Sequence, residues 1–296
     1  MRETVSKFHD RVKYWELWND GDRYHDFGHH MPNGWVGSTD EDLELLRSGS
    51  EEIRKIDPKL RILNGGFFTV EKDARHALNP DMAKRVTTEA PDTFDILAAF
   101  DTNPRTLLGP LAELRRSVTP PRPLWLTRVE QRGAVPEELV RRVVSAKAGG
   151  ASAFIWMWAL NFDSGWRGFL MPMASWKTKD RLPINRHSVF QMQSTGCAYI
   201  HAISLLRMLE PAPPIEAGTK GKWIFAFTSA DPKQCGKVLA FWHEKDAADE
   251  AHPLKLDPGT RATLVDIYGN ETPLAADPGG KVLLPIRLEP QYLRIE

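Results

Sequence analysis

Short apolar runs alternate with longer amphipathic segments through the first two thirds of the chain, and this alternation constrains the fold more than any other feature. The runs lie at residues 12–19, 60–66, 94–100, 124–127 and 153–160. Most of them are continuous apolar stretches, as expected of strands that are covered on both faces. Strands that alternate with helical segments in this way predict an α/β fold with a parallel sheet.

Helical segments fill the intervals between these runs. The segment at residues 39–57 starts with Thr39 as a candidate N-cap, and Asp42 completes a variant of the capping box. It ends at Asp57-Pro58, because the residue before a proline disfavours the helical conformation. The other expected helices are at residues 2–13, 107–118, 136–148 and 193–209, with a short one within 67–92.

The pattern changes at Pro211-Ala212-Pro213-Pro214. Beyond it, short candidate strands are separated by Gly, Pro and Asp turns, at residues 222–228, 238–243, 262–267 and 282–288. Short strands with such turns are typical of an antiparallel β-domain. We therefore expect two domains, an α/β domain at residues 1–212 and a small antiparallel β-domain at 213–296.

The charge balance excludes some classes of partner. The chain carries 39 Lys and Arg against 39 Asp and Glu, so no net charge draws it to nucleic acid or an anionic membrane. No apolar run approaches the ~20 residues of a membrane helix, and the first residues lack the apolar core of a signal peptide. Cys197 and Cys235 form no disulfide framework, although one bridge stays open. The sequence leaves the compartment open.

Four strand motifs, in the same order along the chain, resemble those of clan A glycoside hydrolases of the family 39 and family 5 types. Tyr14-Trp15-Glu16-Leu17-Trp18-Asn19-Asp20 is similar to their fourth strand. Residues 94–103, 123–127 and 154–160 are similar to their sixth, seventh and eighth strands. The resemblance implies a TIM-barrel-like (β/α)8 fold followed by a small antiparallel β-sandwich. It also implies retaining hydrolysis of O-glycosyl bonds in oligo- or polysaccharides, without a cofactor, and enzymes of this kind are often secreted or periplasmic.

The resemblance places the two catalytic carboxylates at positions that have changed here. The acid/base position holds Asp20 and the nucleophile position holds Arg128, where the family has glutamate at both. A guanidinium stays protonated and cannot attack an anomeric carbon. Glu130 lies about 6.6 Å further along the strand and would need a bulge or bend to take over. Glu16 falls at a position that is usually buried and structural in the family.

We therefore expect a catalytically degenerate or truncated glycoside hydrolase, and the alternative is a non-catalytic carbohydrate-binding or scaffolding module. Asp20 and Arg128 should form a salt bridge across the former catalytic cleft. Residues expected to contact the sugar are Trp15, Asn19, Asp101, Asn103, Arg128, Trp158, Asp163 and Trp166.

Two features near these positions leave more than one interpretation. Trp156 and Trp158 share a strand face, where either could stack on sugar or pack in the core. The loop cluster of His25, His29 and His30 would suit a metal only if it were helical, and Gly28 argues against a helix. We expect no metal.

The fourth-strand motif begins at residue 14, so the chain offers no sequence for strands one to three. A complete barrel takes about 250 residues. An incomplete barrel would expose the edges of its first and last strands. Three explanations stay open: a truncated gene, a partner chain that supplies the missing half, and self-association through the strand edges.

Overall fold

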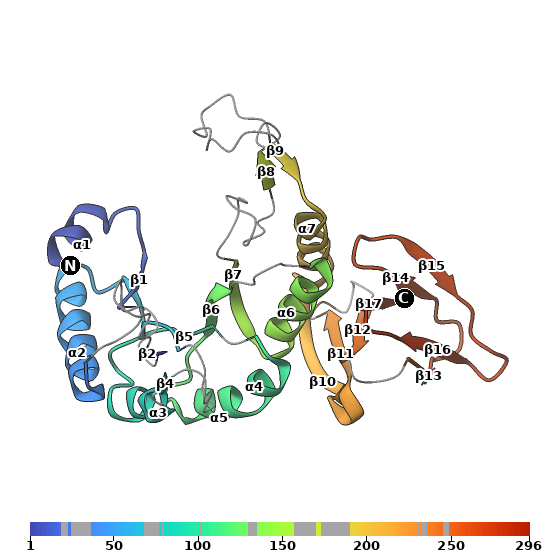
Figure 1. The fold of residues 1–296 in the computed structure, drawn as a ribbon, viewed down its shortest axis with the longest axis horizontal. Coiled ribbons are helices and arrows are strands. Elements are labelled where there is room, and N and C mark those ends of the chain that lie inside the picture. The colour runs from blue at the N-terminus through green and yellow to red at the C-terminus, as the bar shows by residue number, and fades with distance from the viewer. Residues whose placement is uncertain are drawn as a thin grey trace. The chain divides into compact units, whose positions relative to one another are not determined.

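The computed structural model forms two compact units, one of Met1–Val129 with Gly149–Trp156 and one of Glu130–Ala148 with Met157–Glu296. We describe each unit by itself (Figure 1). The residues that the structure describes are 1–18, 23–24, 37–67, 77–78, 80–100, 102–129, 135–156, 170–172, 190–229, 231, 236–244 and 249–296.

Five parallel strands form the centre of the first unit. They are β1 (Tyr14–Glu16), β3 (Arg61–Leu63), β5 (Leu97–Ala99), β6 (Leu124–Val129) and β7 (Ala151–Trp156). β1 pairs with β3, and β5, β6 and β7 pair in that order, all in parallel. Two isolated parallel bridges join the β3 segment to the β5 segment. The strand order is therefore β1-β3-β5-β6-β7, and the parallel arrangement agrees with the prediction from the sequence.

Helices connect successive strands of this unit (Figure 1). After α1 (Arg2–Phe8), helix α2 (Thr39–Ile56) lies between β1 and β3, and α3 (Pro80–Glu89) lies between β3 and β5. The single helix expected at 107–118 is two helices, α4 (Pro104–Leu108) and α5 (Pro110–Ser117). The chain breaks at Gly109, whose φ and ψ are −103° and −109°, and Pro110 then starts the second helix. The short strands β2 (Arg23–Tyr24) and β4 (Ala77–Leu78) pair antiparallel.

The N-terminus of α2 corrects one detail of the sequence prediction. Ser38, not Thr39, is the N-cap. Its Oγ accepts a hydrogen bond from the Glu41 backbone N–H at 3.2 Å, and Glu41 Oε2 accepts one from the Ser38 N–H at 2.6 Å. The reciprocal pair is a capping box shifted by one residue from the predicted one, because Glu41 reaches back to the cap more easily than the shorter Asp42 does.

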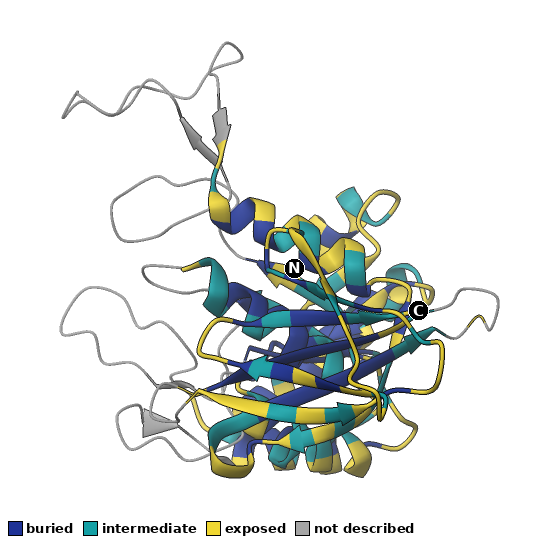
Figure 2. Cartoon of the chain, turned by 90° about the vertical axis from the view of Figure 1, so that its right-hand side faces the viewer, coloured by how far each residue is buried: buried dark blue, intermediate teal, exposed yellow. Residues whose placement is uncertain are grey.

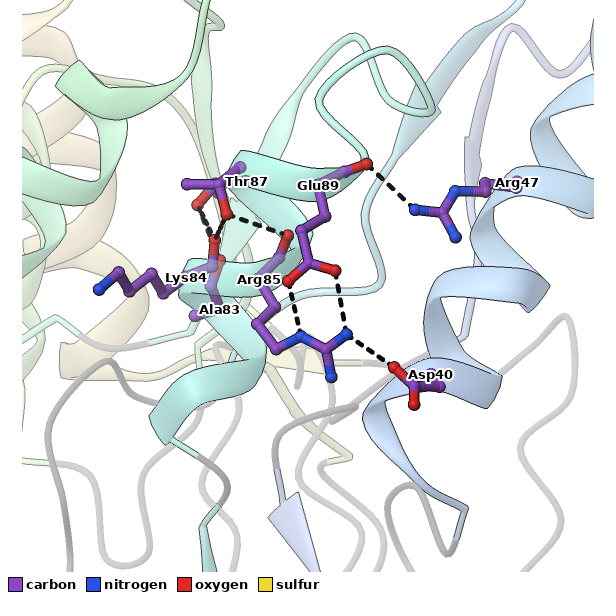
Figure 3. Close-up of polar contacts among 8 residues, drawn as sticks. Asp40, Arg47, Ala83, Lys84, Arg85, Thr87 and Glu89 are labelled. Carbon is purple, nitrogen blue, oxygen red and sulfur yellow. Dashed lines mark hydrogen bonds and ion pairs between the residues drawn. The ribbon is translucent and has the colours of Figure 1, made fainter.

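Arg85 ties α3 to the first turn of α2 (Figure 3). Its guanidinium donates to both carboxylate oxygens of Glu89, at 2.7 and 2.9 Å, and to Asp40 Oδ1 at 2.6 Å. On the same side, Arg47 of α2 donates to the Glu89 backbone oxygen at 3.1 Å. These contacts fix neighbouring helices along the outside of the strands.

The parallel strands curl so that strands distant in the sheet approach each other. In a flat sheet β1 and β6 would lie about 14 Å apart, three strand spacings. Instead, the rings of Tyr14 and Trp125 lie 4.7 Å apart between centroids, and Thr127 Oγ1 donates to Glu16 Oε1 at 3.0 Å. Trp125 also packs on a small core of Leu63, Ile96 and Ala98. These side chains therefore share one concave inner face.

The second unit is built on a six-stranded antiparallel sheet with the order β10-β11-β12-β17-β14-β15. Its core contains side chains from this sheet and from the separate β13–β16 pair, and includes Phe241 and Leu284, each fully buried. Figure 2 shows buried strand segments running through this sheet. The strand bounds are β10 (Leu209–Ala217), β11 (Lys222–Ser229), β12 (Lys237–His243), β13 (Glu250–Lys255), β14 (Ala262–Val265), β15 (Glu271–Leu274), β16 (Lys281–Ile286) and β17 (Gln291–Ile295).

The sequence predicted four of these eight strands, β11, β12, β14 and β16. It missed β10, which begins at Leu209 and runs across the expected domain boundary at 212. That boundary stays a prediction.

Helices α6 (Pro136–Ala148) and α7 (Ser194–Leu206) pack against each other within this second unit, and α6 also contacts β10 and β11. Arg141 of α6 donates to the backbone oxygen of Leu288, which anchors the helix to the segment before β17. His201 of α7 contacts the Tyr292 ring edge-on, with centroids 5.8 Å apart. A short antiparallel pair, β8 (Leu170–Pro172) and β9 (Phe190–Met192), and a 3-10 turn (Thr219–Gly221) complete the elements.

Candidate functional site

The carboxyl ends of the parallel strands bring polar and aromatic side chains together in the first unit. In folds of parallel strands joined by helices, binding and catalytic groups gather at this end. Here β1 ends in Glu16, β6 carries Thr127 and Arg128, and Phe100 directly follows β5.

Glu16 is held across the inner face rather than buried. Its side chain is exposed, and Oε1 accepts the hydrogen bond from Thr127 Oγ1. The sequence interpretation placed Glu16 in a buried structural position. In the structure the Glu16 side chain is exposed instead, and it is bound to Thr127 on β6.

Gly66 allows Glu16 and Phe100 to approach the backbone that follows β3. Its φ is +64°, and a Cβ there would lie 2.4 Å from the Phe100 ring and 2.9 Å from Glu16 Oε1. Only glycine meets both conditions. Asn64 fixes the same turn, since its amide bonds both the N–H and the oxygen of Ala98, at 2.6 and 3.4 Å. The Asn64-Gly65-Gly66 run indicates a turn in the sequence, but nothing in the sequence connects this turn with the site.

A register irregularity in β6 affects where Arg128 lies. The pairing of β6 with β7 shifts between Leu126 and Val129, and both of these side chains are buried. A bulge of this kind changes the face to which the next side chains point. The Arg128 guanidinium carbon lies 6.0 Å from the centre of the Phe100 ring. Arg128 is thus next to the aromatic ring that borders Glu16.

Asp42 lies in the first turn of α2, the helix that follows the loop after β1. Its side chain is buried, with 4% of the residue exposed. Burial raises the pKa of the Asp42 carboxyl to about 6, because the apolar surroundings disfavour the charged form. The carboxyl therefore changes charge just below neutral pH.

The structure describes three of the residues predicted to act in the site. Arg128 lies at the strand end, as stated above. Trp15 alternates with Tyr14 and Glu16 and so points to the opposite strand face, where its Nε1 donates to the Val12 oxygen at 3.1 Å. Asn103 is exposed and caps α4 by accepting a hydrogen bond from the Arg105 N–H at 2.9 Å. A sugar contact for any of the three stays a prediction.

The other predicted site residues lie outside the described residues, so the Asp20–Arg128 salt bridge and the replacement of the nucleophile by Glu130 stay predictions. Trp156 is buried, which favours core packing over sugar stacking for that side chain. The predicted site residues outside the described ranges are Asn19, Asp20, Asp101, Glu130, Trp158, Asp163 and Trp166, and the same holds for His25, His29, His30 and Cys235.

In the part of the chain that the structure describes, no three or more His, Cys, Asp or Glu side chains are grouped so that they could hold a metal ion. None of the helices in this part of the chain combines the length and apolarity needed to cross a membrane.

Comparisons with known proteins add a fold relationship. No protein-family model matches the sequence, and no curated protein matches it significantly. Among solved structures, a family 39 glycoside hydrolase from the gut symbiont Bacteroides cellulosilyticus WH2 is similar with a TM-score of 0.69 at 16% identity, over 100% of this chain and 60% of that one. The catalytic domain of the GH30 xylanase C from Talaromyces cellulolyticus gives 0.59 at 13%, over 99% and 65%.

A family 51 α-L-arabinofuranosidase from Bifidobacterium longum gives a TM-score of 0.59 at 11% identity, over 97% of this chain and 67% of that one. The chain thus spans 60% and 65% of the first two neighbours. At these identities the likeness concerns the fold, and the fold that this mixed helix and strand chain shares is that of glycoside hydrolases.

Proposed function

We propose that this chain is a glycoside-hydrolase-like protein that binds oligo- or polysaccharide at the carboxyl ends of its parallel strands and has lost retaining hydrolysis. The observation that carries the proposal is Arg128. It stands at the end of β6, where the family resemblance expects the nucleophilic glutamate, and its guanidinium lies beside Phe100. Retaining hydrolysis needs a carboxylate there, about 5 Å from the acid/base group.

We further propose that the fold is a partial (β/α)8 barrel followed by a small β-sandwich. On this interpretation, the five parallel strands correspond to barrel strands four to eight. The contacts of Tyr14 with Trp125 and of Glu16 with Thr127 agree with the curvature that a barrel requires.

The same strand ends would bind sugar without cleaving it. Asn19, Trp158, Asp163 and Trp166 supply hydrogen bonds and stacking surfaces from the loops, by resemblance. Asp20 at the acid/base position pairs with Arg128, and this pairing neutralises the guanidinium that replaced the nucleophile. Such a set of residues would recognise hydroxyls and ring faces but would lack a group able to form a covalent glycosyl intermediate.

A second candidate is a weak hydrolase that uses Glu130 as nucleophile and Asp20 as acid/base. Glu130 needs a bulge or bend to reach the former nucleophile position. The register irregularity between Leu126 and Val129, directly before Glu130, is the observation that favours this alternative.

One experiment separates the two candidates. The chain is titrated with xylo-, xyloglucan and arabino-oligosaccharides by calorimetry and is assayed with aryl glycosides for turnover. Binding without turnover supports the proposal. Turnover that disappears on Glu130→Gln or Asp20→Asn, but not on Glu51→Gln at an exposed position of α2, supports the weak hydrolase. If the chain shows no binding and no turnover, both candidate functions are contradicted.

A further inference from the structure

The inner face of the first unit carries a second group of side chains, which precede the carboxyl ends of β1 and β6. Tyr14 on β1 and Trp125 on β6 lie 4.7 Å apart between ring centroids, with an angle of 43° between their planes. Tyr14 is 51% exposed although it lies within a strand, and Trp125 is partly exposed. A partly exposed aromatic pair of this kind offers ring faces to a ligand.

A fixed carboxylate lies next to this aromatic pair. Glu16 is two residues after Tyr14 on the same strand face, a spacing of about 6.6 Å. Its Oε1 accepts the hydrogen bond from Thr127 and lies near the Gly66 backbone, where an added Cβ would come within 2.9 Å of it. The carboxylate is therefore held in place before any ligand arrives, which lowers the entropy lost on binding.

We propose that Tyr14, Glu16, Trp125 and Thr127 form a sugar-binding subsite. An aromatic pair and a carboxylate–hydroxyl pair stand about one sugar ring apart. The apolar C–H face of the sugar stacks on Tyr14 and Trp125, and its neighbouring hydroxyls donate to Glu16. Glu16 is a binding residue in this subsite, and Thr127 is the residue that positions it. The inference rests on the proposed carbohydrate function. It adds ligand-binding side chains that the strand motifs did not indicate.

Paired variants test the subsite by calorimetry with the same three oligosaccharide probes. Glu16→Gln keeps the shape and can still accept the Thr127 hydrogen bond, but it removes the charge that strengthens bonds from sugar hydroxyls. We expect about tenfold weaker binding or more. Tyr14→Ala and Thr127→Val should weaken binding to a similar extent. The conservative variants Tyr14→Phe and Thr127→Ser, which keep the ring and the hydroxyl, should recover most of the affinity lost in Tyr14→Ala and Thr127→Val.

A second measurement uses the unaltered protein, so that it does not depend on how the variants fold. The indole N–H resonance of Trp125, assigned by its loss in Trp125→Phe, should shift as the sugar is added.

The outcomes distinguish the subsite from the function on which it rests. If sugar binds but Glu16→Gln and Tyr14→Ala bind it equally well, or if the Trp125 resonance stays in place at saturation, the subsite is wrong and carbohydrate binding stands. If none of the three probes binds, the proposed function and the subsite fall together.

Discussion

At the scale of single residues, the first unit tolerates two local costs. One is a buried carboxyl at Asp42, and the other is a left-handed backbone at Gly66, which borders the candidate site. Residues that lower stability near a site are common where binding constrains the sequence more than folding does.

Asp42→Asn should stabilise the protein at neutral pH. The pKa of Asp42 is raised to about 6 in the folded state, so between about pH 4 and 6 the folded state binds more protons than the unfolded chain. Stability contributed by the protonated carboxyl is therefore present at low pH and is lost as the pH rises through about 6. The substitution should raise the free energy of unfolding by roughly 1–3 kcal/mol at pH 7.5 and by much less at about pH 4. Urea unfolding at the two pH values measures this, and an equal gain at both would contradict the assigned cause.

Gly66→Ala should destabilise the first unit by at least about 2 kcal/mol, because it combines a left-handed residue with overlap against Phe100 and Glu16. Gly259→Ala is the matched control, since Gly259 also has a positive φ, +81°, but a Cβ there would meet no atom within 4 Å. The control should lose only the backbone part, about 1–2 kcal/mol. Thermal unfolding of both variants compares the losses, and equal losses would mean that the close approach at Gly66 is absent in solution.

At the scale of elements, the helices of the first unit depend on their ends and on contacts between neighbours. The capping box at Ser38 sets where α2 begins, and Arg85 joins that first turn to α3.

Ser38→Ala should lower the free energy of unfolding by about 1 kcal/mol, since it removes the acceptor of the Glu41 N–H. Ser48→Ala is the control on the same helix, because the Ser48 hydroxyl is exposed and bonds only back to Glu44 and Leu45 carbonyls. Alanine there should be neutral or slightly stabilising. Chemical denaturation distinguishes the two, and a neutral Ser38→Ala would show that Thr39 serves as the cap, as the sequence first suggested.

At the scale of the whole molecule, sequence reasoning found the parallel strands because buried strands are continuous apolar runs. It missed β10 because three prolines between Leu209 and Ala217 resemble a linker, although proline is tolerated on an edge strand, and β10 is at the edge of its sheet. It missed the contact between Glu16 and Thr127 because that contact depends on sheet curvature. Local residue patterns carry no information on curvature.

The outer edges of β1 and β7 in the first unit lead to a prediction about association. β1 and β7 end the described strand order, and they carry exposed Tyr14 and Ile155, at 51% and 44%. Edges of this kind pair with other strands unless something covers them. We expect the isolated chain to self-associate, with a mass that rises over about 1–100 μM in sedimentation experiments. A monomer over this range would instead favour cover from a longer chain or a separate partner.

The Glu16–Thr127 hydrogen bond also has a kinetic consequence. The two residues are 111 positions apart, so the contact closes a very long loop. The entropy of closing such a loop is lost before the contact is gained, and contacts of this kind slow folding. We expect β1 to join the other parallel strands late, so that Thr127→Val speeds unfolding while the refolding rate stays nearly unchanged. The strand that carries Trp15 and Glu16 would then be the first to leave, and the lifetime of the inner face would be set by its departure.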